Sequence, residues 1–484
     1  MRILHCVHGF LPESVGGTES YVRDLVLAQR DAGHTPHILG GSLEVWPKVG
    51  SESTDFEGIP VERVHRSDLY FDSWQKTHCP EVGQLFSAYL ETLRPDLVHV
   101  HQWIRLTDDL VTRAAKAGVP SVVTLHDLYT SCPRAFRMRD GDEFCERPLS
   151  PESCLGCAPQ RPWQDEAAVA SAITLYDRAY RSELHHARAV LVAGQETADL
   201  IAKTTGRPAD RLEAIGLAYT PRTGQLRGRK AAVPAPGEPV RLGVWGHINE
   251  RKGNDLLVEA FAELAQKPGL PPLELHVFGK IDTEQLAAKM QRAAEGANVT
   301  FHGRFEWDQI LAANLHLAVI PTRCFETWGF VLDEAFELGL PVVVPDIGVI
   351  PGRIGGAGVK FRCNDKGDLV NVLERLVTSP EELKRLAAQI PEPTSDLGSH
   401  LARVLGAYDR AIAMGPPDLE SQDELNELRA AVDFQWKESY FRRHLEREGL
   451  DAHIENLERE LQHFREEDAR KAQHIEWLES RLKD

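Results

Sequence analysis

The sequence lacks any run of apolar residues long enough to cross a membrane, for which about eighteen are needed. It is also short of positive charge, because 55 lysines and arginines face 73 aspartates and glutamates, for a formal net charge of −18. Non-specific nucleic-acid binding depends on clustered cations. We therefore expect neither a membrane-spanning helix nor a nucleic-acid partner.

The amino terminus also lacks the features of a signal peptide, since Met1 to His8 reads directly as a buried strand. We expect a cytoplasmic protein. Two local basic stretches interrupt the acidic background, at Arg134 to Arg139 and at Arg222 to Lys230. Each could be solvated, or could contact an anionic acceptor or the inner face of the membrane, so peripheral membrane association stays open.

Strands and helices alternate along most of the 484 residues, 42% of which are hydrophobic. Arg2–His8, Pro95–His101 and Pro120–His126 each read as a buried strand that ends in a loop. Alternation with helices predicts α/β domains with doubly wound parallel sheets. Ligands bind such sheets at the carboxyl ends of the strands, where His101 and His126 fall. A lone histidine is more often structural, and of the two we favour His126 as functional.

Composition divides the chain into two such domains and a tail. We assign residues 1–216 to the first domain, 217–239 to a proline-rich linker, 240–395 to the second domain, 396–417 to a helix that returns to the first domain and then breaks, and 418–484 to a helical coiled coil.

One stretch of the second domain carries two carboxylates around the start of a predicted helix. Glu326 precedes the helix and Glu334 lies two turns inside it, so the two can lie roughly 12 Å apart along the axis. The free amides of Gly329, Phe330 and Val331 point out of the helix start, where a diphosphate is stabilised. A long ligand with hydroxyls at both ends fits this pattern, whereas the alternative is two solvated acids. A glycosidase pair is different, because its carboxylates flank one bond within roughly 5 to 9.5 Å.

Two strand-to-helix loops have the composition of phosphate-binding loops. Gly16-Gly17 follows the first strand, and glycine there allows the backbone to approach a phosphate closely. Gly246 to Gly253 follows the first strand of the second domain and contains Arg251 and Lys252. Cations in such a loop suit a diphosphate, although a plain tight turn would also explain the glycines.

Together these residues resemble the signature of retaining glycosyltransferase family 4, whose members have the GT-B fold of two facing Rossmann-like domains. The similarity covers residues 1 to about 414 and includes the Gly-Gly-Thr-Glu loop near the start. It implies that Glu326 lies against the donor sugar, that Glu334 holds the ribose, and that the amides of 329–331 take the phosphates. His126 matches the His-Asp position near the donor sugar and the acceptor, and Arg304 matches the position that faces the nucleotide base.

The sequence departs from the family in one loop. The family typically has an arginine directly after the first glycine of the loop that begins at Gly246, and a lysine before the last. Lys252 matches the lysine, but His247 stands in place of the arginine, with Arg251 as a nearby substitute. The departure bears on how strongly the diphosphate is held.

The resemblance implies an enzyme that moves a sugar from a nucleotide diphosphate donor to a hydroxyl of a glycan or lipid-linked acceptor, in surface polysaccharide synthesis and without a required metal. The expected catalytic residues are Glu326, His126 and Lys252. The expected donor-binding residues are Gly16, Gly17, His247, Arg251, Lys252, Arg304, Glu326, Gly329, Phe330, Val331 and Glu334. An alternative from another class is a donor-binding scaffold in an assembly complex with little or no activity, suggested by His247 and by the helical tail.

Four of the eight cysteines cluster between positions 132 and 157. Cys154 and Cys157 have the two-residue gap that lets two thiolates reach one tetrahedral metal, and a reducing cytoplasm favours metal over a disulfide. We predict a structural zinc ion bound by Cys132, Cys145, Cys154 and Cys157 in an insertion of the first domain. Idle thiols in a loop are the alternative.

The tail has the pattern of a coiled coil. Its seam positions recur on alternating three- and four-residue steps, and they are apolar at Ile454, Leu457, Leu461, Phe464, Ile475, Leu478 and Leu482 and polar at Asp468 and Lys471. A single helix cannot bury such a seam, so we expect a homo-oligomer or a coiled-coil partner enzyme, and a helix packed back on the catalytic domains is the alternative. On this interpretation, truncation after Met414 leaves a monomer that still transfers sugar.

Overall fold

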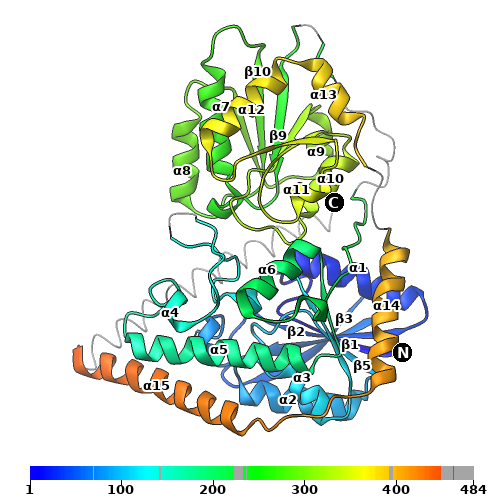
Figure 1. Cartoon of the computed structure of the whole chain (residues 1–484), viewed down its shortest axis with the longest axis vertical. Helices are drawn as coiled ribbons and strands as arrows, with labels where there is room; N and C mark the ends of the chain where they lie inside the picture. Colours follow the sequence, from blue (N-terminus) through cyan, green and yellow to red (C-terminus); the bar gives the residue numbers. More distant parts are fainter. Residues whose placement is uncertain are drawn as a thin grey trace.

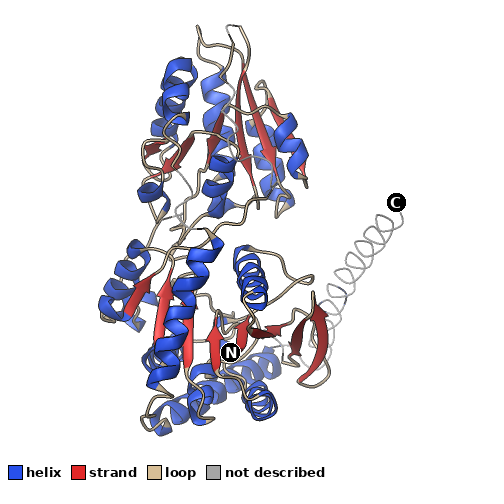
Figure 2. Cartoon of the chain, turned by 90° about the vertical axis from the view of Figure 1, so that its right-hand side faces the viewer, coloured by secondary structure: helices blue, strands red, loops and turns tan. Residues whose placement is uncertain are grey.

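The computed structural model describes residues 1–68, 70–140, 143–222, 233–235, 237–391 and 396–447, together with residues 460 and 462. Figure 1 shows two domains stacked along the long axis of the molecule. Figure 2, a quarter-turn away, shows that helices cover both faces of each sheet. The prediction of two doubly wound α/β domains is confirmed.

The first domain is built on an eight-stranded sheet in the order β3-β4-β2-β1-β5-β6-β7-β8, in which every pairing is parallel except that of β3 with β4. Its strands are β1 (Arg2–Val7), β2 (Thr35–Gly41), β3 (Gly50–Phe56), β4 (Ile59–His65), β5 (Leu97–Val100), β6 (Ser121–Leu125), β7 (Ala189–Val192) and β8 (Leu212–Ala214). Its helices are α1 (Gly17–Asp31), α2 (Pro80–Leu93), α3 (Leu110–Lys116), α4 (Pro151–Cys154), α5 (Glu166–His186) and α6 (Gln195–Thr205), with 3-10 turns η1 (Trp74–Lys76), η2 (Tyr129–Ser131) and η3 (Ala209–Arg211). The strand order reverses between β1 and β5, which marks the switch point where such sheets bind ligands.

The second domain has a six-stranded parallel sheet in the order β11-β10-β9-β12-β13-β14. Its strands are β9 (Val240–Trp245), β10 (Leu273–Phe278), β11 (Val299–Gly303), β12 (Leu317–Val319), β13 (Val342–Pro345) and β14 (Gly358–Phe361). Its helices are α7 (Asn254–Ala265), α8 (Glu284–Ala293), α9 (Trp307–Ala312), α10 (Phe330–Glu337), α11 (Ile350–Arg353), α12 (Lys366–Val377) and α13 (Pro380–Ala387), with the 3-10 turn η4 (Glu250–Lys252). Here the order reverses between β9 and β12, so the loops after these two strands flank the switch point.

Helix α14 (Leu397–Met414) leaves the second domain and lies on the first, where Figure 1 draws it in orange beside the lower sheet. Val404, Ala407 and Ala411 of this helix are buried in one apolar cluster with Val22 and Leu25 of α1. The core of the first domain therefore includes a helix from beyond the second domain.

Helix α15 (Asp423–Arg447) runs along α5 at the base of the first domain (Figure 1). Its Leu425, Val432 and Trp436 are buried, and its Arg429 pairs with the buried Asp108 at 3.0 Å. The first part of the segment that we predicted as a coiled coil is thus packed back on the catalytic domains. The heptad seam that begins at residue 454 lies outside the described residues.

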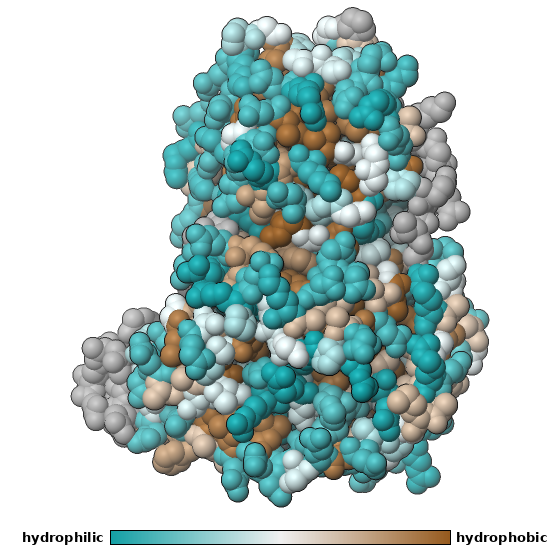
Figure 3. Space-filling view, viewed as in Figure 1, coloured by the Kyte–Doolittle hydropathy of each residue, from teal (hydrophilic) through white to brown (hydrophobic). Residues whose placement is uncertain are grey.

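Across the described ranges, none of the helices combines the length and the apolar character that a membrane span requires. The space-filling view in Figure 3 shows a face that is mostly hydrophilic, with hydrophobic patches on both domains and near the junction between them. The carboxyl ends of strands from both domains meet at this junction. Ligands bind such sheets at these ends, so the junction is the candidate ligand-binding site.

Candidate functional site

Lys252 and Glu326 meet at the switch point of the second sheet. Lys252 ends the turn η4 after β9, and Glu326 lies in the loop between β12 and α10. The Lys252 ammonium donates a hydrogen bond to Glu326 Oε1 at 2.5 Å, and the Thr322 hydroxyl donates to the same oxygen at 3.2 Å. The lysine side chain keeps 40% of its surface exposed, against 15% for the glutamate, so the lysine is the more accessible member of the pair.

The two charges of this pair stabilise each other against burial. Burial disfavours ionisation of both groups, but Glu326 raises the pKa of Lys252, and Lys252 holds the pKa of Glu326 below its ordinary value. Both groups are therefore charged at neutral pH.

Replacing Lys252 by methionine should move the acid limb of the pH–rate profile to higher pH. Without the cation, burial raises the pKa of Glu326, and the carboxylate takes up its proton earlier as the pH falls. Rates measured at saturating substrate across the acid range test this. The exposed Lys280 of the same domain, changed to methionine, is the control, and an acid limb at the wild-type position in Lys252→Met would contradict the prediction.

Glycines hold both members of the pair because the backbone approaches too closely for a side chain. Gly253 has a φ of +65°, and a Cβ there would lie 2.0 Å from the carbonyl oxygen of Pro321. Gly348 has a φ of +81°, and a Cβ there would lie 2.8 Å from the backbone nitrogen and oxygen of Glu326. A side chain at Gly253 would push the Lys252 turn away from Pro321, and one at Gly348 would displace the backbone of Glu326.

Glu334 lies inside α10 and turns toward the end of β9. Its Oε2 accepts a hydrogen bond from Trp245 Nε1 at 2.9 Å, and its Oε1 accepts one from Arg222 Nε at 3.3 Å. Burial raises the pKa of Glu334, and Arg222 opposes that rise. Two donors therefore orient the carboxylate to which the resemblance gives the ribose.

The start of α10 faces the glycine loop of the first domain. Gly329 precedes the helix with a left-handed φ of +75°, and a Cβ there would lie 2.5 Å from Ile350 Cδ1. A Cβ on Gly17 would lie 3.8 Å from Phe330 Cδ2, so the Gly16-Gly17 loop and the helix start are neighbours across the junction. The structure brings together these predicted donor residues, which are more than 300 positions apart in the sequence.

His126 follows β6 at the same junction. Its carbonyl oxygen accepts a hydrogen bond from the Thr327 hydroxyl at 2.6 Å, so it is joined to the residue next to Glu326. Its Nε2 lies 3.0 Å from Nδ1 of the buried His101. Burial, together with the charges of neighbouring histidines, lowers the pKa of His126 to about 3, so the ring is neutral.

Three other predicted donor residues have different surroundings. The side chain of His247 is 63% exposed and pairs with Asp282. The guanidinium of Arg251 lies 4.0 Å from the ring centroid of Phe136, in the cysteine-rich insertion of the first domain. Arg304 follows β11 and is exposed. None of these arrangements reproduces the arginine that the family places after the first glycine of the loop.

Restoring that arginine should tighten donor binding. We expect His247→Arg to lower the dissociation constant for a nucleotide sugar about tenfold, because one hydrogen bond to a charged group contributes about 1.5 to 3 kcal/mol. Isothermal titration of the wild type and the variant measures the change. An unchanged dissociation constant would show that Arg251 already binds the diphosphate in place of the missing arginine. Introducing Arg251→Gln into the wild type and into His247→Arg identifies that case.

The basic stretch from Arg134 to Arg139 is largely neutralised within its own loop. Arg134 pairs with Asp140 at 2.8 Å, and Arg139 pairs with Glu143 at 3.0 Å. Arg137 is buried and donates to backbone carbonyl oxygens. These contacts leave little positive charge in the stretch for a membrane surface or an anionic acceptor.

The four clustered cysteines share one insertion, and all four thiols are free. The backbone N–H of Cys157 donates to the carbonyl oxygen of Cys154 at 3.0 Å, which closes the turn between them. Within the described part of the chain, no three of the four sulfur atoms lie within 4.8 Å of one another. A zinc ion here stays a prediction, and binding would require the insertion to draw the thiols together.

Metal analysis of protein purified without a metal-affinity tag tests this prediction. We expect one zinc ion per chain, and we expect Cys154→Ser to lose it because a structural site needs all four ligands. Cys363→Ser is the control, since Cys363 lies in the second domain. Metal-free protein in which all four clustered thiols titrate freely in the folded state would refute the site.

The sequence interpretation missed the residues that orient the two glutamates. Gly348 had a local signal, because it lies in the short turn directly after the buried strand β13. Trp245 and Thr322 had no such signal. Their hydrogen bonds to the carboxylates form only in the folded protein, so the sequence spacing of these residues does not indicate them.

Two family profiles match the chain, one over each domain. Residues 16–218 match the glycosyl transferase 4-like domain, and residues 239–379 match the glycosyl transferases group 1. The chain belongs to the group 1 glycosyltransferases. The two profiles thus confirm the family resemblance that the sequence motifs of this group 1 glycosyltransferase indicated.

Known proteins agree with this family and with the fold. A D-inositol 3-phosphate glycosyltransferase of Rhodococcus erythropolis is 29% identical to this glycosyltransferase over 310 residues, which are 61% of the chain and 63% of the relative's own length. Sucrose-phosphate synthase from Thermosynechococcus elongatus superposes with a TM-score of 0.57 at 18% identity, over 89% of this chain and 100% of that one. Anabaena HepE in complex with UDP and glucose superposes with a TM-score of 0.56 at 17% identity, over 84% of this chain and 99% of that one. These structures establish the GT-B fold.

Proposed function

We propose that the protein is a retaining glycosyltransferase that moves a sugar from a nucleotide diphosphate donor to a hydroxyl group of an acceptor. The observation that carries the proposal is the Lys252–Glu326 pair at the switch point of the second sheet, joined through Thr327 to His126 of the first domain. Lys252 and the amides of 329–331 supply positive charge to the leaving diphosphate, while Glu326 orients the sugar. Retention, and transfer without a metal, follow from the family resemblance.

For the acceptor we propose a neutral compound, a glycan or a lipid-linked sugar, in surface polysaccharide synthesis. The name of the Rhodococcus relative implies an acceptor that carries a phosphate. A phosphate group is typically held by arginine or lysine. In the insertion, however, Arg134 and Arg139 are paired with acids, and Arg251 across from it lies on the ring of Phe136. These contacts favour an acceptor without charge.

A donor screen followed by a transfer assay tests both parts. Thermal shift with UDP-, GDP- and ADP-sugars selects the donor, and nucleotide release is then measured with D-inositol 3-phosphate in one arm and neutral oligosaccharides in the other. NMR of the anomeric proton of the product shows whether the anomeric configuration of the donor sugar is retained. Release only with the phosphorylated acceptor would overturn the neutral acceptor, and an inverted product would overturn retention.

A donor-binding scaffold is the second candidate function. The observation that favours it is His247, which takes the place of the family's arginine and pairs with Asp282. Stabilisation by a nucleotide sugar without nucleotide release in any acceptor arm would support the scaffold. Release that depends on Glu326 would exclude it.

A further inference from the structure

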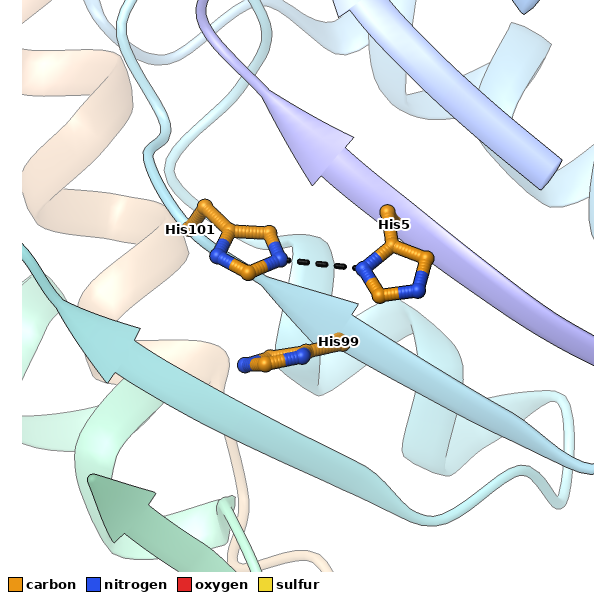
Figure 4. A group of neighbouring side chains, drawn as sticks. All are labelled: His5, His99 and His101. Atoms are coloured by element: carbon orange, nitrogen blue, oxygen red, sulfur yellow. Dashed lines mark hydrogen bonds between the residues drawn. The ribbon is translucent and has the colours of Figure 1, made fainter. Parts of the chain in front are cut away.

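A group of buried histidines lies in the first domain beneath the junction. Strands β1 and β5 are neighbours whose register places His5 opposite His99, and His101 lies two residues further along, on the same side. Figure 4 shows the three rings together, with the hydrogen bond of 3.0 Å between His5 Nδ1 and His101 Nε2. All three residues are at least 98% buried, so each ring nitrogen needs a partner inside the protein.

Three histidines at this spacing could suggest a metal site, since their nitrogens lie within 4.8 Å of one another. A metal ligand must offer a lone pair to the ion, however, and both nitrogens of each ring already take part in a hydrogen bond. Binding an ion would break several of these bonds. The arrangement is better described as one hydrogen-bonded chain, which we call the histidine chain: His126, His101, His5, Gln29, Tyr408 and His99.

Tyr408 of α14 sets the direction of the hydrogen bonds in this chain. Its hydroxyl lies 2.6 Å from His99 Nδ1, and His99 Nε2 lies 2.7 Å from the Thr124 hydroxyl. A phenol is a stronger donor and a weaker acceptor than a neutral imidazole, so Tyr408 donates to His99. Its oxygen then accepts from Gln29 Nε2 at 3.2 Å, which turns the amide oxygen of Gln29 toward His5.

Once the orientation of the Gln29 amide is set, the donor and acceptor nitrogens of each following histidine ring are determined in turn. Gln29 Oε1 accepts from His5 Nε2 at 2.8 Å, so His5 Nδ1 accepts from His101 Nε2. His101 Nδ1 then accepts from His126 Nε2 at 3.0 Å, which leaves a lone pair on His126 Nδ1.

The order of donors holds because the rings are neutral. Burial lowers the pKa of His5 to about 4 and that of His126 to about 3, and it takes the pKa of His101 well below the ordinary value. Each neutral ring then carries one N–H, which is the number that a one-way chain needs.

We propose that Tyr408, through the histidine chain, fixes His126 as the Nε2–H tautomer, so that Nδ1 accepts a hydrogen bond from a sugar hydroxyl bound between the domains. The part that concerns the sugar rests on the proposed function, whereas the tautomer does not. The hydroxyl belongs to the donor sugar or to the acceptor. Tyr408, Gln29, His5 and His101 are positioning residues, because they act through His126.

Nitrogen-15 NMR of histidine-labelled protein without ligand tests the tautomer directly. We expect a protonated Nε2 and an unprotonated Nδ1 on His126, whose signals are assigned by their loss in His126→Gln. Tyr408→Phe removes only the hydroxyl, which frees the Gln29 amide to turn, so we expect both tautomers there. Tyr180→Phe, a buried hydroxyl outside the chain, should keep the wild-type spectrum. A protonated Nδ1 in the wild type, or an unchanged tautomer in Tyr408→Phe, would overturn the proposal.

Steady-state kinetics of the same variants identify the source of the hydroxyl. Losing one well-oriented hydrogen bond should lower kcat/KM about three- to tenfold in Tyr408→Phe. The loss should lie in the KM of the acceptor if the acceptor supplies the hydroxyl, and in the donor constant if the donor sugar does. Unchanged kinetics beside a mixed tautomer would refute the role in sugar binding. A wild type with the expected tautomer but without any transfer would instead refute the proposed function.

Discussion

Replacing Glu326 by glutamine should lower the rate of sugar transfer about a hundredfold or more, the usual cost of removing one preorganised electrostatic contact. Glutamine keeps the shape of the side chain but loses the charge that pairs with Lys252. Lys252→Ala should have an effect of similar size, because it removes the cation that we propose to stabilise the leaving diphosphate. Initial rates at saturating nucleotide sugar measure both.

The matched control is Glu250→Gln, since Glu250 is exposed on the same turn η4 as Lys252. Its rate should stay near that of the wild type. Thermal unfolding of the Glu326 and Lys252 variants separates a chemical effect from a loss of structure. Near-normal rates in both variants would remove the ion pair from the mechanism.

Shortening Trp436 to alanine should lower the free energy of unfolding by about 3 kcal/mol, as truncation of a buried aromatic side chain typically does. Trp436 is 8% exposed, and its ring centroid lies 6.1 Å from those of Tyr70 and Trp163. The truncation removes the ring that contacts both of these aromatic side chains of the first domain. Equilibrium unfolding in urea, followed by circular dichroism, measures the change.

Phe434→Ala supplies the comparison on the same helix. Phe434 is 66% exposed, so its truncation should change the free energy of unfolding by no more than about 0.5 kcal/mol. Equal effects at positions 434 and 436 would mean that α15 does not pack against α5. The same packing revises our expectation for truncation after Met414, because removal of α15 uncovers the apolar surface beneath Leu425 and Val432, and the product should be less stable.

Local pattern was enough to predict the framework of the site. The loop with Lys252, the carboxylate before a helix at Glu326 and the histidine after a strand at His126 each depend on a few neighbouring residues. Parallel sheets bring the ends of such strands to one edge, so sequence order already implies which loops share the switch point.

The remainder depends on contacts between distant segments. The hydrogen bond from Trp245 to Glu334 and the approach of Gly348 to Glu326 result from tertiary packing, which periodicity does not encode. For α15 the sequence carried a second signal, because Leu425 and Val432 also recur at helical spacing, seven residues apart. The longer seam beyond residue 454 outweighed it, and a helix that packs on its own chain has the same local pattern as one that packs on a partner.

Helix α14 has a further consequence for how the chain is made. Its residues 397–414 complete the core of a domain that begins at residue 2, and Gln29 is hydrogen-bonded to Tyr408 across 379 positions. Domains generally fold in order as they leave the ribosome. Here the amino-terminal sheet emerges first, yet the apolar cluster around Val22 and Leu25 of α1 gains the side chains of α14 only after residues 397–414 have been translated. The second domain must therefore emerge, and can fold, before α14 and α15 are available to complete the first.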